Sequence, residues 1–377
     1  MQSVLNEIMR LRNDVPISID YQNTNRYRLV AQEKDGSKTA YYFSTPIYNR
    51  VSRKLVDLRF HNSGRDFYAQ GSEAQTTFSR DIVLGNEQGM CTVGLGQQPV
   101  LISDREARCG NTAIMPTMNG IALKLSATGN NAICFTLNVS RTDLFVRAND
   151  KCFALMEEKF RPFAVLSCIG ATDAMGNVIS PARVEYEKVT DREYRIILSA
   201  TSPMAQYILC ECNLYENKLF QDTTVESKNP STNNAFGGTA FIGNTQMYGE
   251  QWLYTRPDYS KFPEIMDKRI LKAVLHMPKL NQSNVGIGAF KVASRFCSFG
   301  SNWNNKVAGA VPVADSKEDN GYQSLDITSL LVDQRTRTLM RPDGLILRPK
   351  MREYGFSVIG TGDSSYAPQI LEINFRH

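Results

Sequence analysis

The sequence predicts an all-β protein, a multidomain arrangement of the antiparallel β-sandwich or jelly-roll type with a short N-terminal helix. Runs of alternating apolar and polar residues recur along most of the chain, and Gly, Asn, Asp and Pro separate them at short intervals. Alternation puts every second side chain on one face of a strand, so each run can bury one face and expose the other. Only two short segments, in the first dozen residues and at 156–160, have a helical pattern instead.

Length and composition indicate a globular protein of several domains. The chain has 377 residues, enough for two or three domains with substantial cores. Hydrophobic residues make up 42% and charged residues 21%, both ordinary values. The net charge of +5 is small and dispersed, whereas a nucleic-acid groove needs clustered Lys and Arg. We therefore expect no nucleic-acid partner, and we expect the one local basic cluster, at 50–54, to be a solvated loop.

Residues 1–20 are predicted to form an N-terminal amphipathic segment. The apolar positions that fit one face of a short helix are Val4, Leu5, Ile8, Met9 and Leu11. Docking on the first domain of the same chain is the simpler expectation, and docking on a neighbouring subunit is the alternative. Charges interrupt the segment and no small-residue cleavage site follows it, so we expect no signal peptide and synthesis in a cytoplasm. No run reaches 18 apolar residues, so no membrane span is expected.

Residues 21–214 are predicted to be a β-rich region that forms one large or two small sandwiches, with a possible boundary at 98–118. Its clearest hairpin signal is the dipeptide Asp35-Gly36 between strands at 26–34 and 37–43, which is typical of a tight type I′ turn. A second hairpin is predicted where the strand at 121–125 meets the turn formers 128–131 and returns as the strand 133–139. The segment Met156 to Phe160 is the one predicted helix in this region.

The eight cysteines are predicted to be small core residues that form no disulfides. The sequence has no CxxC motif, and a chain of this length does not need cross-links to fold. In the run 208–214, alternation places Cys210 and Cys212 on the same face as Ile208 and Leu214. A thiolate metal site is the alternative, but too few histidines are present to complete one.

Residues 215–377 are predicted to form a separate β-sandwich domain. A strand, a loop rich in Asn, Gly and Pro at 229–238, and another strand open the domain. Further strand-like segments follow at 269–280, 290–296, 344–347 and 369–375. Leu325 to Leu331 is predicted to be a strand followed by a short turn, with a final helical turn as the alternative, since Asp326 and Thr328 are both suitable caps.

The order of these segments resembles the DNRLRE domain family, whose members look like carbohydrate-binding modules. The resemblance covers about 160 residues and is carried by three pieces: the loop that begins Asn229-Pro230-Ser231-Thr232-Asn233, the tripeptide Trp303-Asn304-Asn305, and Leu325 to Leu331 leading to Gly344 to Leu347. The resemblance implies a jelly-roll-like sandwich of surface, secreted and particle-borne proteins. It implies no catalytic residues.

Few residues are suited to catalysis. The only histidines are His61, His276 and His377, which leaves little for a Ser-His-Asp triad, a Cys-His pair or a His-rich metal site. Gly94-Leu95-Gly96 lacks the third glycine of a phosphate-binding loop. Neighbouring acids such as Glu157 and Glu158 do not by themselves give the separation that glycoside hydrolysis requires. We expect no catalytic residues, no metal and no cofactor.

Aromatic and amide side chains provide a candidate sugar-contact site in the C-terminal domain. Sugar binding uses exposed aromatic faces together with polar groups that hydrogen-bond hydroxyls. The candidate residues are Trp252, Tyr254, Tyr259, Trp303, Asn304 and Asn305. The alternative for Trp303 is a place in the sandwich core, because it follows a predicted strand.

Three functions are consistent with these observations. The leading hypothesis is a non-enzymatic structural protein of a large assembly, such as a bacteriophage virion or phage-tail-like particle, located on the particle surface and bound to other subunits. In this hypothesis residues 1–20 and the N-terminal region contact those subunits, and the C-terminal sandwich faces outward. The second hypothesis is a glycan-binding adhesive module on a cell or spore surface. The third is a hydrolase of unfamiliar type.

Overall fold

The protein folds into two compact β units. The computed structural model describes residues 4–64, 66–127, 132–214, 218–282, 285–351 and 354–376. It is 53% strand and 5% helix, which confirms the predicted all-β class. The first unit consists of Asn49–Glu216 and Phe236–Gly238, and the second of Val4–Tyr48, Asn217–Ala235 and Thr239–His377.

Two antiparallel sheets form the first unit within the described residues. The first sheet has the order β18-β19-β13-β8-β7-β6-β5-β4. Its strands are β4 (Asp57–Asn62), β5 (Phe67–Gln70), β6 (Gln75–Phe78), β7 (Ile82–Asn86), β8 (Gly89–Gly94), β13 (Ile133–Val139), β18 (Ala182–Lys188) and β19 (Glu193–Ala200). The second sheet has the order β14-β15-β16-β20-β12-β11-β10-β9, with β17 beside β16. Its strands are β9 (Val100–Leu101), β10 (Ala107–Cys109), β11 (Thr112–Thr117), β12 (Gly120–Ser126), β14 (Phe145–Ala148), β15 (Cys152–Glu158), β16 (Arg161–Thr172), β17 (Val178–Ser180) and β20 (Tyr207–Leu214).

One hydrophobic cluster takes side chains from both sheets, so the first unit is a β-sandwich. Phe78 and Leu137 come from one sheet, and Leu123, Cys210 and Cys212 from the other. The face predicted for the run 208–214 is confirmed, because all four of its inward residues belong to this cluster. All eight cysteines lie within the described residues and none forms a disulfide. Six are buried as predicted, but Cys134 and Cys297 are exposed, so the predicted core position is wrong for these two.

The predicted hairpin between 121–125 and 133–139 is wrong. β12 pairs with β11 and β20, whereas β13 pairs with β8 and β19 in the other sheet. The chain therefore crosses from one sheet to the other, and the predicted turn at 128–131 lies outside the described residues. Both strands still direct their alternating apolar residues into the same core. Alternation identified the buried faces, but it carries no information about which strand pairs with which.

The predicted helix at 156–160 is also wrong. Met156 to Glu158 ends strand β15, and a turn at Lys159 and Phe160 leads directly into β16. The register between β15 and β16 shifts on both sides of Met156. Such an irregularity breaks the two-residue period locally, which explains why the segment does not have a strand-like pattern.

The second unit also contains two sheets within its described residues. One has the order β1-β2-β3-β31-β24-β28-β27, and the other has β26-β25-β29-β23-β22-β30, with β21 beside β23. The strands of the first are β1 (Ser18–Ile19), β2 (Arg28–Gln32), β3 (Lys38–Phe43), β24 (Arg269–Pro278), β27 (Lys317–Asp319), β28 (Tyr322–Asp326) and β31 (Ile370–Arg376). The strands of the second are β21 (Phe220–Glu226), β22 (Thr239–Thr245), β23 (Gly249–Pro257), β25 (Ile287–Val292), β26 (Gly309–Asp315), β29 (Leu345–Pro349) and β30 (Gly355–Gly360).

The second sheet of this unit has a hydrophobic cluster on each face. Leu253 and Leu347 join the main core, which also takes Leu275 and Leu371 from the facing sheet. The neighbouring residues on the same strands point the opposite way, and Tyr254 belongs to a smaller cluster with side chains from the loop after β25. This smaller cluster holds most of the predicted aromatic candidates.

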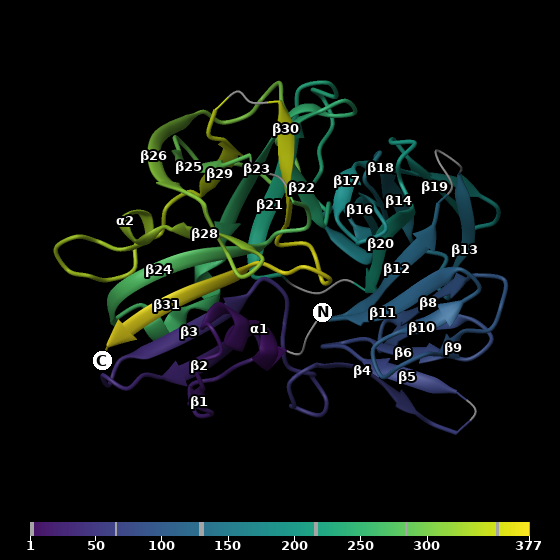
Figure 1. Ribbon diagram of the computed structural model, residues 1–377, viewed down its shortest axis with the longest axis horizontal. Coiled ribbons are helices and arrows are strands. Elements are labelled where there is room, and N and C mark those ends of the chain that lie inside the picture. Colours follow the sequence, from purple (N-terminus) through teal and green to yellow (C-terminus); the bar gives the residue numbers. More distant parts are fainter. Residues whose placement is uncertain are drawn as a thin grey trace. The chain divides into compact units, whose positions relative to one another are not determined.

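The N-terminal hairpin belongs to the second unit. β3 pairs with β31 along its whole length, from Lys38 opposite Phe375 to Phe43 opposite Ile370. Figure 1 shows the purple β2 and β3 beside the yellow β31 and the green β24. The division drawn from sequence had grouped this hairpin with residues 21–214. The pairing joins segments more than 300 residues apart, which local patterns do not reveal.

The turn of this hairpin is not the predicted type I′. Just beyond the last strand pair, Gln32 and Lys38, the amide of Glu33 donates to the carbonyl of Ser37 at 2.9 Å, and the amide of Gly36 donates to the carbonyl of Glu33 at 3.2 Å. Gly36 has a φ of 81°, whereas Asp35 has no positive φ. The loop is therefore a type I turn followed by a left-handed glycine, which is the usual three-residue hairpin connection.

The helix α1 (Val4–Leu11) is confirmed and docks on the second unit. Tyr322 on β28 donates a hydrogen bond to the carboxylate of Glu7, and the Arg10 guanidinium lies 4.6 Å from the centre of the Tyr322 ring. Arg12, just after the helix, forms two bonds with Glu33 at 2.6 and 2.9 Å. The helix segment thus docks on its own chain, both on β28 of the C-terminal region and on Glu33 of the hairpin β2–β3, which lies within the region 21–214.

The segment 325–331 combines the two alternatives that the sequence left open. Strand β28 ends at Asp326, and the short helix α2 (Thr328–Leu331) follows. Asp326 accepts bonds from the amide and hydroxyl of Thr328, at 3.0 and 2.6 Å.

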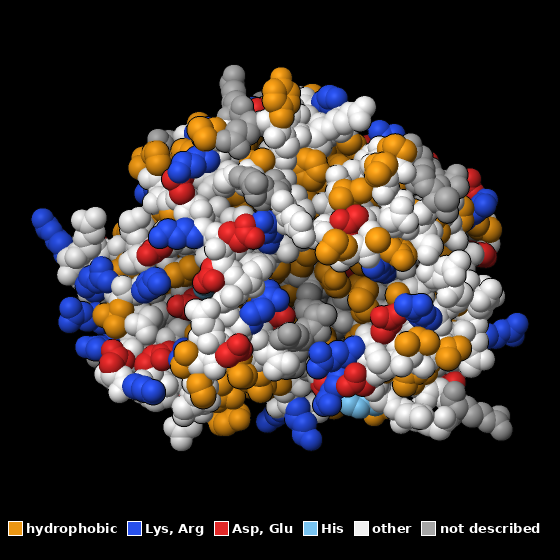
Figure 2. All heavy atoms as spheres, viewed as in Figure 1, with side chains coloured by type: hydrophobic (Ala, Val, Ile, Leu, Met, Phe, Trp, Pro, Cys, Tyr) orange, Lys and Arg blue, Asp and Glu red, His pale blue; other side chains and the backbone are white. Residues whose placement is uncertain are grey.

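On the face shown in Figure 2, basic side chains of Lys and Arg are interspersed with acidic side chains of Asp and Glu, and they do not gather into one basic surface.

Candidate functional site

The structure brings four of the six predicted aromatic and amide residues together on one face of the second unit. Trp252 and Tyr254 alternate along β23, so both point away from the main core. Trp303, Asn304 and Asn305 come from the loop that connects β25 to β26 and covers this face. Of these five, only Tyr254 is fully buried, so the surface group consists of Trp252, Trp303, Asn304 and Asn305.

The two tryptophans form a half-buried pair. Their ring centroids lie 5.1 Å apart with planes inclined at 55°. The indole N–H of Trp252 donates to Oε1 of Glu250 at 2.8 Å, which fixes the ring orientation. Neither ring is in the main core, but both pack, partly buried, against the smaller hydrophobic cluster, so Trp303 lies between the two alternatives that the sequence left open.

Two cations border the tryptophan pair. Nζ of Lys306 lies 4.0 Å from the centre of the Trp303 ring and donates to the Trp303 carbonyl at 3.0 Å. The Arg348 guanidinium lies 5.5 Å from the Trp252 ring and 3.9 Å from the Phe290 ring. Such cation–π contacts contribute about 0.5–1 kcal/mol each at exposed sites. The same cations would also favour a ligand that carries negative charge.

The amides beside the pair are held in a compact turn. Oδ1 of Asn305 accepts from the amide of Asn302 at 2.7 Å, and Nδ2 of Asn305 donates to the Gly300 carbonyl at 3.1 Å. Asn304 reaches the neighbouring loop, where Nδ2 donates to Oγ of Ser231 at 3.3 Å. Both side chains are exposed, and the turn presents them next to Trp303.

Tyr254 supports this surface from below and does not take part in it. Its side chain is fully buried, and its hydroxyl donates to the Val307 carbonyl at 2.5 Å. Burial raises the pKa of Tyr254 well above its ordinary value, so the phenol stays neutral and remains a donor. The role expected for Tyr254, contact with a ligand, is therefore replaced by anchoring of the covering loop.

Tyr259 lies apart from the tryptophan pair. It belongs to the short 3-10 helix η1 (Tyr259–Lys261) and packs against the main core, with its ring 6.2 Å from that of Phe262. The sequence grouped it with Trp252 because the two are close along the chain, but β23 ends between them.

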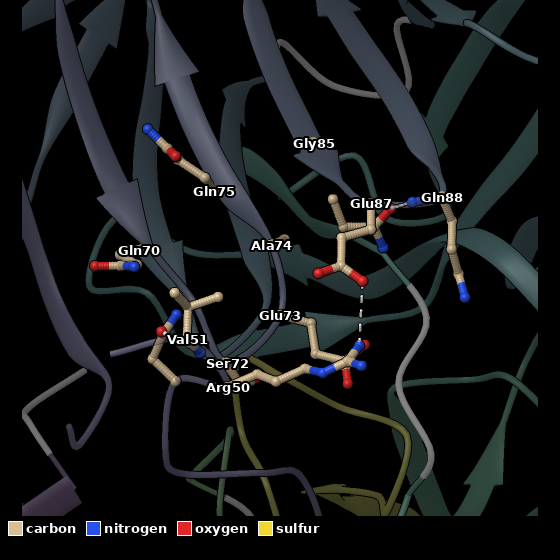
Figure 3. Close-up of a pocket in the computed structure, with 12 residues that line it drawn as sticks. Arg50, Val51, Gln70, Ser72, Glu73, Ala74, Gln75, Gly85, Glu87 and Gln88 are labelled. Carbon is tan, nitrogen blue, oxygen red and sulfur yellow. Dashed lines mark hydrogen bonds and ion pairs between the residues drawn. The ribbon is translucent and has the colours of Figure 1, made fainter. Parts of the chain in front are cut away.

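A polar pocket in the first unit was not predicted. It has a volume of about 220 Å³ and lies where three turns meet. Its walls are Asn49, Arg50, Val51, Gln70, Ser72, Glu73, Ala74, Gln75, Gly85, Asn86, Glu87 and Gln88. Figure 3 shows Gln70 and Gln75 on one side, Glu87 and Gln88 on the other, and Arg50 linked to Glu87.

Buried amides fix the walls of this pocket. Nδ2 of Asn49 donates to the Gly71 carbonyl at 2.8 Å, and Oδ1 of Asn119 accepts from the amides of Glu73 and Ala74 at 3.0 and 2.7 Å. The ion pair between Arg50 and Glu87 is 3.7 Å long with exposed side chains, so it contributes about 0–1 kcal/mol. The solvated loop expected at 50–54 is exposed, but its first residue also lines the pocket. The pocket forms only where the three turns meet in the folded structure, and no sequence motif predicts it.

The histidine that the sequence placed in an apolar strand, His276, has hydrogen-bonding partners within its sheet. His276 links two strands: Nδ1 lies 2.8 Å from Oγ of Ser324 on β28 and Nε2 lies 3.3 Å from Oε2 of Glu372 on β31. Among the described residues, no group of three or more His, Cys, Asp or Glu side chains is arranged to hold a metal ion. No helix in the described part of the chain is long and apolar enough to cross a membrane.

Comparison with known proteins gives no assignment: neither a protein-family model nor a curated protein sequence matches this chain.

Proposed function

We propose that this protein is a non-enzymatic structural component of a large protein assembly, such as a bacteriophage virion or a phage-tail-like particle. The observation that carries the proposal is an exposed aliphatic edge on the second sheet of the first unit. β9 is the last strand in that sheet and pairs on one side only, with β10, within the described residues. A sheet edge presents unpaired backbone N–H and C=O groups that can pair with another chain.

The side chains of this edge favour association. Val100, Leu101 and Ile102 are 61%, 37% and 58% exposed and follow one another along the edge. Soluble proteins usually protect an edge with charged residues, proline or a covering loop, and an exposed apolar edge is an association site. At the opposite end of the same sheet, Phe145 on the edge strand β14 is 48% exposed. The assembly contacts are therefore proposed for the N-terminal half, with the C-terminal sandwich facing outward on the particle.

The test is the association state of the purified protein. We expect the chain to self-associate as its concentration rises, or to be recovered with particles, when its mass is measured by light scattering or sedimentation. Replacing Val100 and Ile102 together by Lys should weaken association strongly, because two charges on an edge strand oppose strand pairing. Met175→Lys is the matched control, since Met175 is 82% exposed in the turn between β16 and β17.

A strict monomer at all concentrations that is never recovered with particles would contradict the proposal. An effect of Met175→Lys as large as that of the edge variant would show that added charge alone, and not the β9 edge, governs association.

A second candidate function, glycan binding, is favoured by one specific observation. The Trp252–Trp303 pair is half-exposed, and Asn304 and Asn305 lie beside it, which is the combination that sugar contact needs. We expect Trp303→Ala to abolish retention on a glycan array or polysaccharide gel. Phe160→Ala, an exposed aromatic substitution in the first unit, should not change it. Failure of the unmodified chain to bind any sugar would remove this candidate.

A further inference from the structure

Two basic side chains beside the tryptophan pair have no acidic partner. Nζ of Lys306 lies 4.0 Å from the centre of the Trp303 ring and 5.6 Å from that of the Trp252 ring, so it reaches both indoles. The Arg348 guanidinium lies 5.5 Å from the centre of the Trp252 ring. Within the part of the chain that the structure describes, neither cation forms an ion pair with a carboxylate. Both cations therefore lie against the same indole, and their charge is unmatched.

Strand pairing places Arg348 beside Trp252. Leu253 on β23 lies opposite Leu347 on β29, and both side chains belong to the main core. Their neighbours Trp252 and Arg348 therefore project from the opposite face of the sheet. The guanidinium also lies 3.9 Å from the centre of the Phe290 ring. The strand backbone and two aromatic rings thus hold this cation in place before a ligand arrives.

The donor groups of these cations are mostly open. The Arg348 guanidinium forms no hydrogen bond with a described residue, so its fork of N–H donors is available to a ligand. Lys306 donates one hydrogen bond, to the Trp303 carbonyl at 3.0 Å, and its other ammonium donors are available. Both side chains are half-buried, so solvent and ligands reach them. A cation that is already held against an aromatic ring loses little further freedom when it binds an anion.

The acid that touches the tryptophan pair does not neutralise these cations. Oε1 of Glu250 accepts the indole N–H of Trp252 at 2.8 Å. The structure has no ion pair between Glu250 and either Lys306 or Arg348. The group around the pair therefore has two positive charges and one negative charge. This local excess of positive charge favours an anionic ligand over a neutral one.

We propose that the surface formed by Trp252, Trp303, Lys306 and Arg348 binds an acidic sugar, one that carries a carboxylate or a sulfate group. The inference rests on the glycan-binding function proposed above and specifies its ligand. The planar guanidinium of Arg348 matches two oxygens of either group, and Lys306 adds a point charge. The apolar face of the sugar ring packs against the exposed part of the tryptophans, and its hydroxyls meet the exposed asparagine amides beside Trp303.

The direct test is a glycan array on which uronate, sialate and sulfated glycans stand beside their neutral counterparts. The full chain should bind an acidic glycan about tenfold or more tightly than the neutral glycan of the same backbone, because charge-assisted hydrogen bonds are added. The carboxylated and sulfated members of the array distinguish the two anions. Polyglutamate and a single-stranded oligonucleotide serve as competitors. If either displaces the glycan as well as the acidic sugar itself does, the surface recognises charge alone and the inference is wrong.

Two substitutions locate the binding of the anion. Arg348→Gln and Lys306→Gln should each raise Kd for the acidic glycan about tenfold and leave Kd for the neutral counterpart unchanged. Arg348→Lys keeps the charge but loses the paired donors, so its Kd should fall between those of the natural chain and Arg348→Gln. Thermal unfolding of each variant shows that it is folded.

Lys291→Gln is the matched control, because it removes an equal charge from an exposed residue on β25. Lys291 lies opposite Leu345, whose side chain belongs to the main core, so the lysine projects from the other face of the sheet. Its substitution should leave Kd for the acidic glycan unchanged.

The inference is overturned if acidic glycans bind no more tightly than neutral ones, or if Lys291→Gln weakens binding as much as Arg348→Gln does. In the first outcome the glycan-binding function stands without a preference for charge. Failure to bind any glycan removes that function together with the inference. Assembly through the β9 edge is measured on other residues by light scattering, so it stands or falls independently.

Discussion

A buried carboxyl group in the second unit makes the stability of that unit depend on pH. Asp222 on β21 is fully buried, forms a hydrogen bond with Asp363 and accepts another from the amide of Gly362. The charged group on the neighbouring side is Lys218, whose Nζ donates to the Asp363 carbonyl at 3.2 Å. Burial raises the pKa of Asp222 from 3.8 to about 6, although its hydrogen bonds and Lys218 act in the opposite direction.

The sign of the effect follows from proton binding. Between pH 4 and pH 6 the folded protein holds a proton that the unfolded chain has lost, so the free energy of unfolding falls as pH rises through this range. The difference between 3.8 and about 6 corresponds to about 3 kcal/mol. Asp222→Asn cannot lose a proton here, and its amide oxygen can still accept from Gly362. Its stability relative to the natural chain should therefore increase by about 3 kcal/mol between pH 4 and pH 7.

Urea unfolding monitored by tryptophan fluorescence measures this difference, because the only two tryptophans, Trp252 and Trp303, both lie in the second unit. Other groups titrate over the same range, so the quantity to compare is the difference between the variant and the natural chain at each pH. Asp319→Asn, at an exposed position on β27, is the control for the change of a carboxylate to an amide at the surface. A flat difference for Asp222→Asn would refute the reasoning.

Three further predictions concern packing, close backbone approach and helix docking. Phe153→Ala removes a buried ring whose centre lies 5.2 Å from that of Tyr194, and it should lower the free energy of unfolding in urea by about 3–5 kcal/mol. The control is Phe160→Ala: the Phe160 ring is exposed, so its removal should lower the free energy of unfolding by less than about 0.5 kcal/mol. Gly360→Ala would place a Cβ 1.9 Å from the Ala367 carbonyl oxygen and should lower the unfolding temperature sharply, whereas Gly286→Ala, with no atom closer than 3.8 Å, should not. Arg12→Met removes both hydrogen bonds to Glu33 and should lower the stability of helix docking by about 1.5–3 kcal/mol. Amide hydrogen exchange in α1 should become faster, and unchanged exchange would show that the Arg12–Glu33 pair does not hold the helix.

Much of the fold could be predicted from local pattern. The N-terminal helix, the hairpin strands around Gly36 and the inward face of 208–214 were recognised from periodicity, and the structure has them. The prediction failed where the period was broken or where pairing was not local. Met156 sits at a register shift and was taken for helix, and β12 and β13 follow each other in the chain but lie in different sheets.

The candidate sites show the same division. Aromatic residues near Trp252 could be recognised from sequence as a group, but Tyr254 proved to be buried and Tyr259 to lie elsewhere. The polar pocket of the first unit was hidden, since its walls come from three separate turns.

The sequence by itself determined which side chains are buried on each strand, because the alternation of side chains is a local property of an extended backbone. Only the tertiary structure decided which strands are neighbours, so that β3 near the start of the chain pairs with β31 at its end. The same physical reason holds for the sites. Burial and unmatched charge arise when distant segments close around a side chain, and no residue carries that information alone.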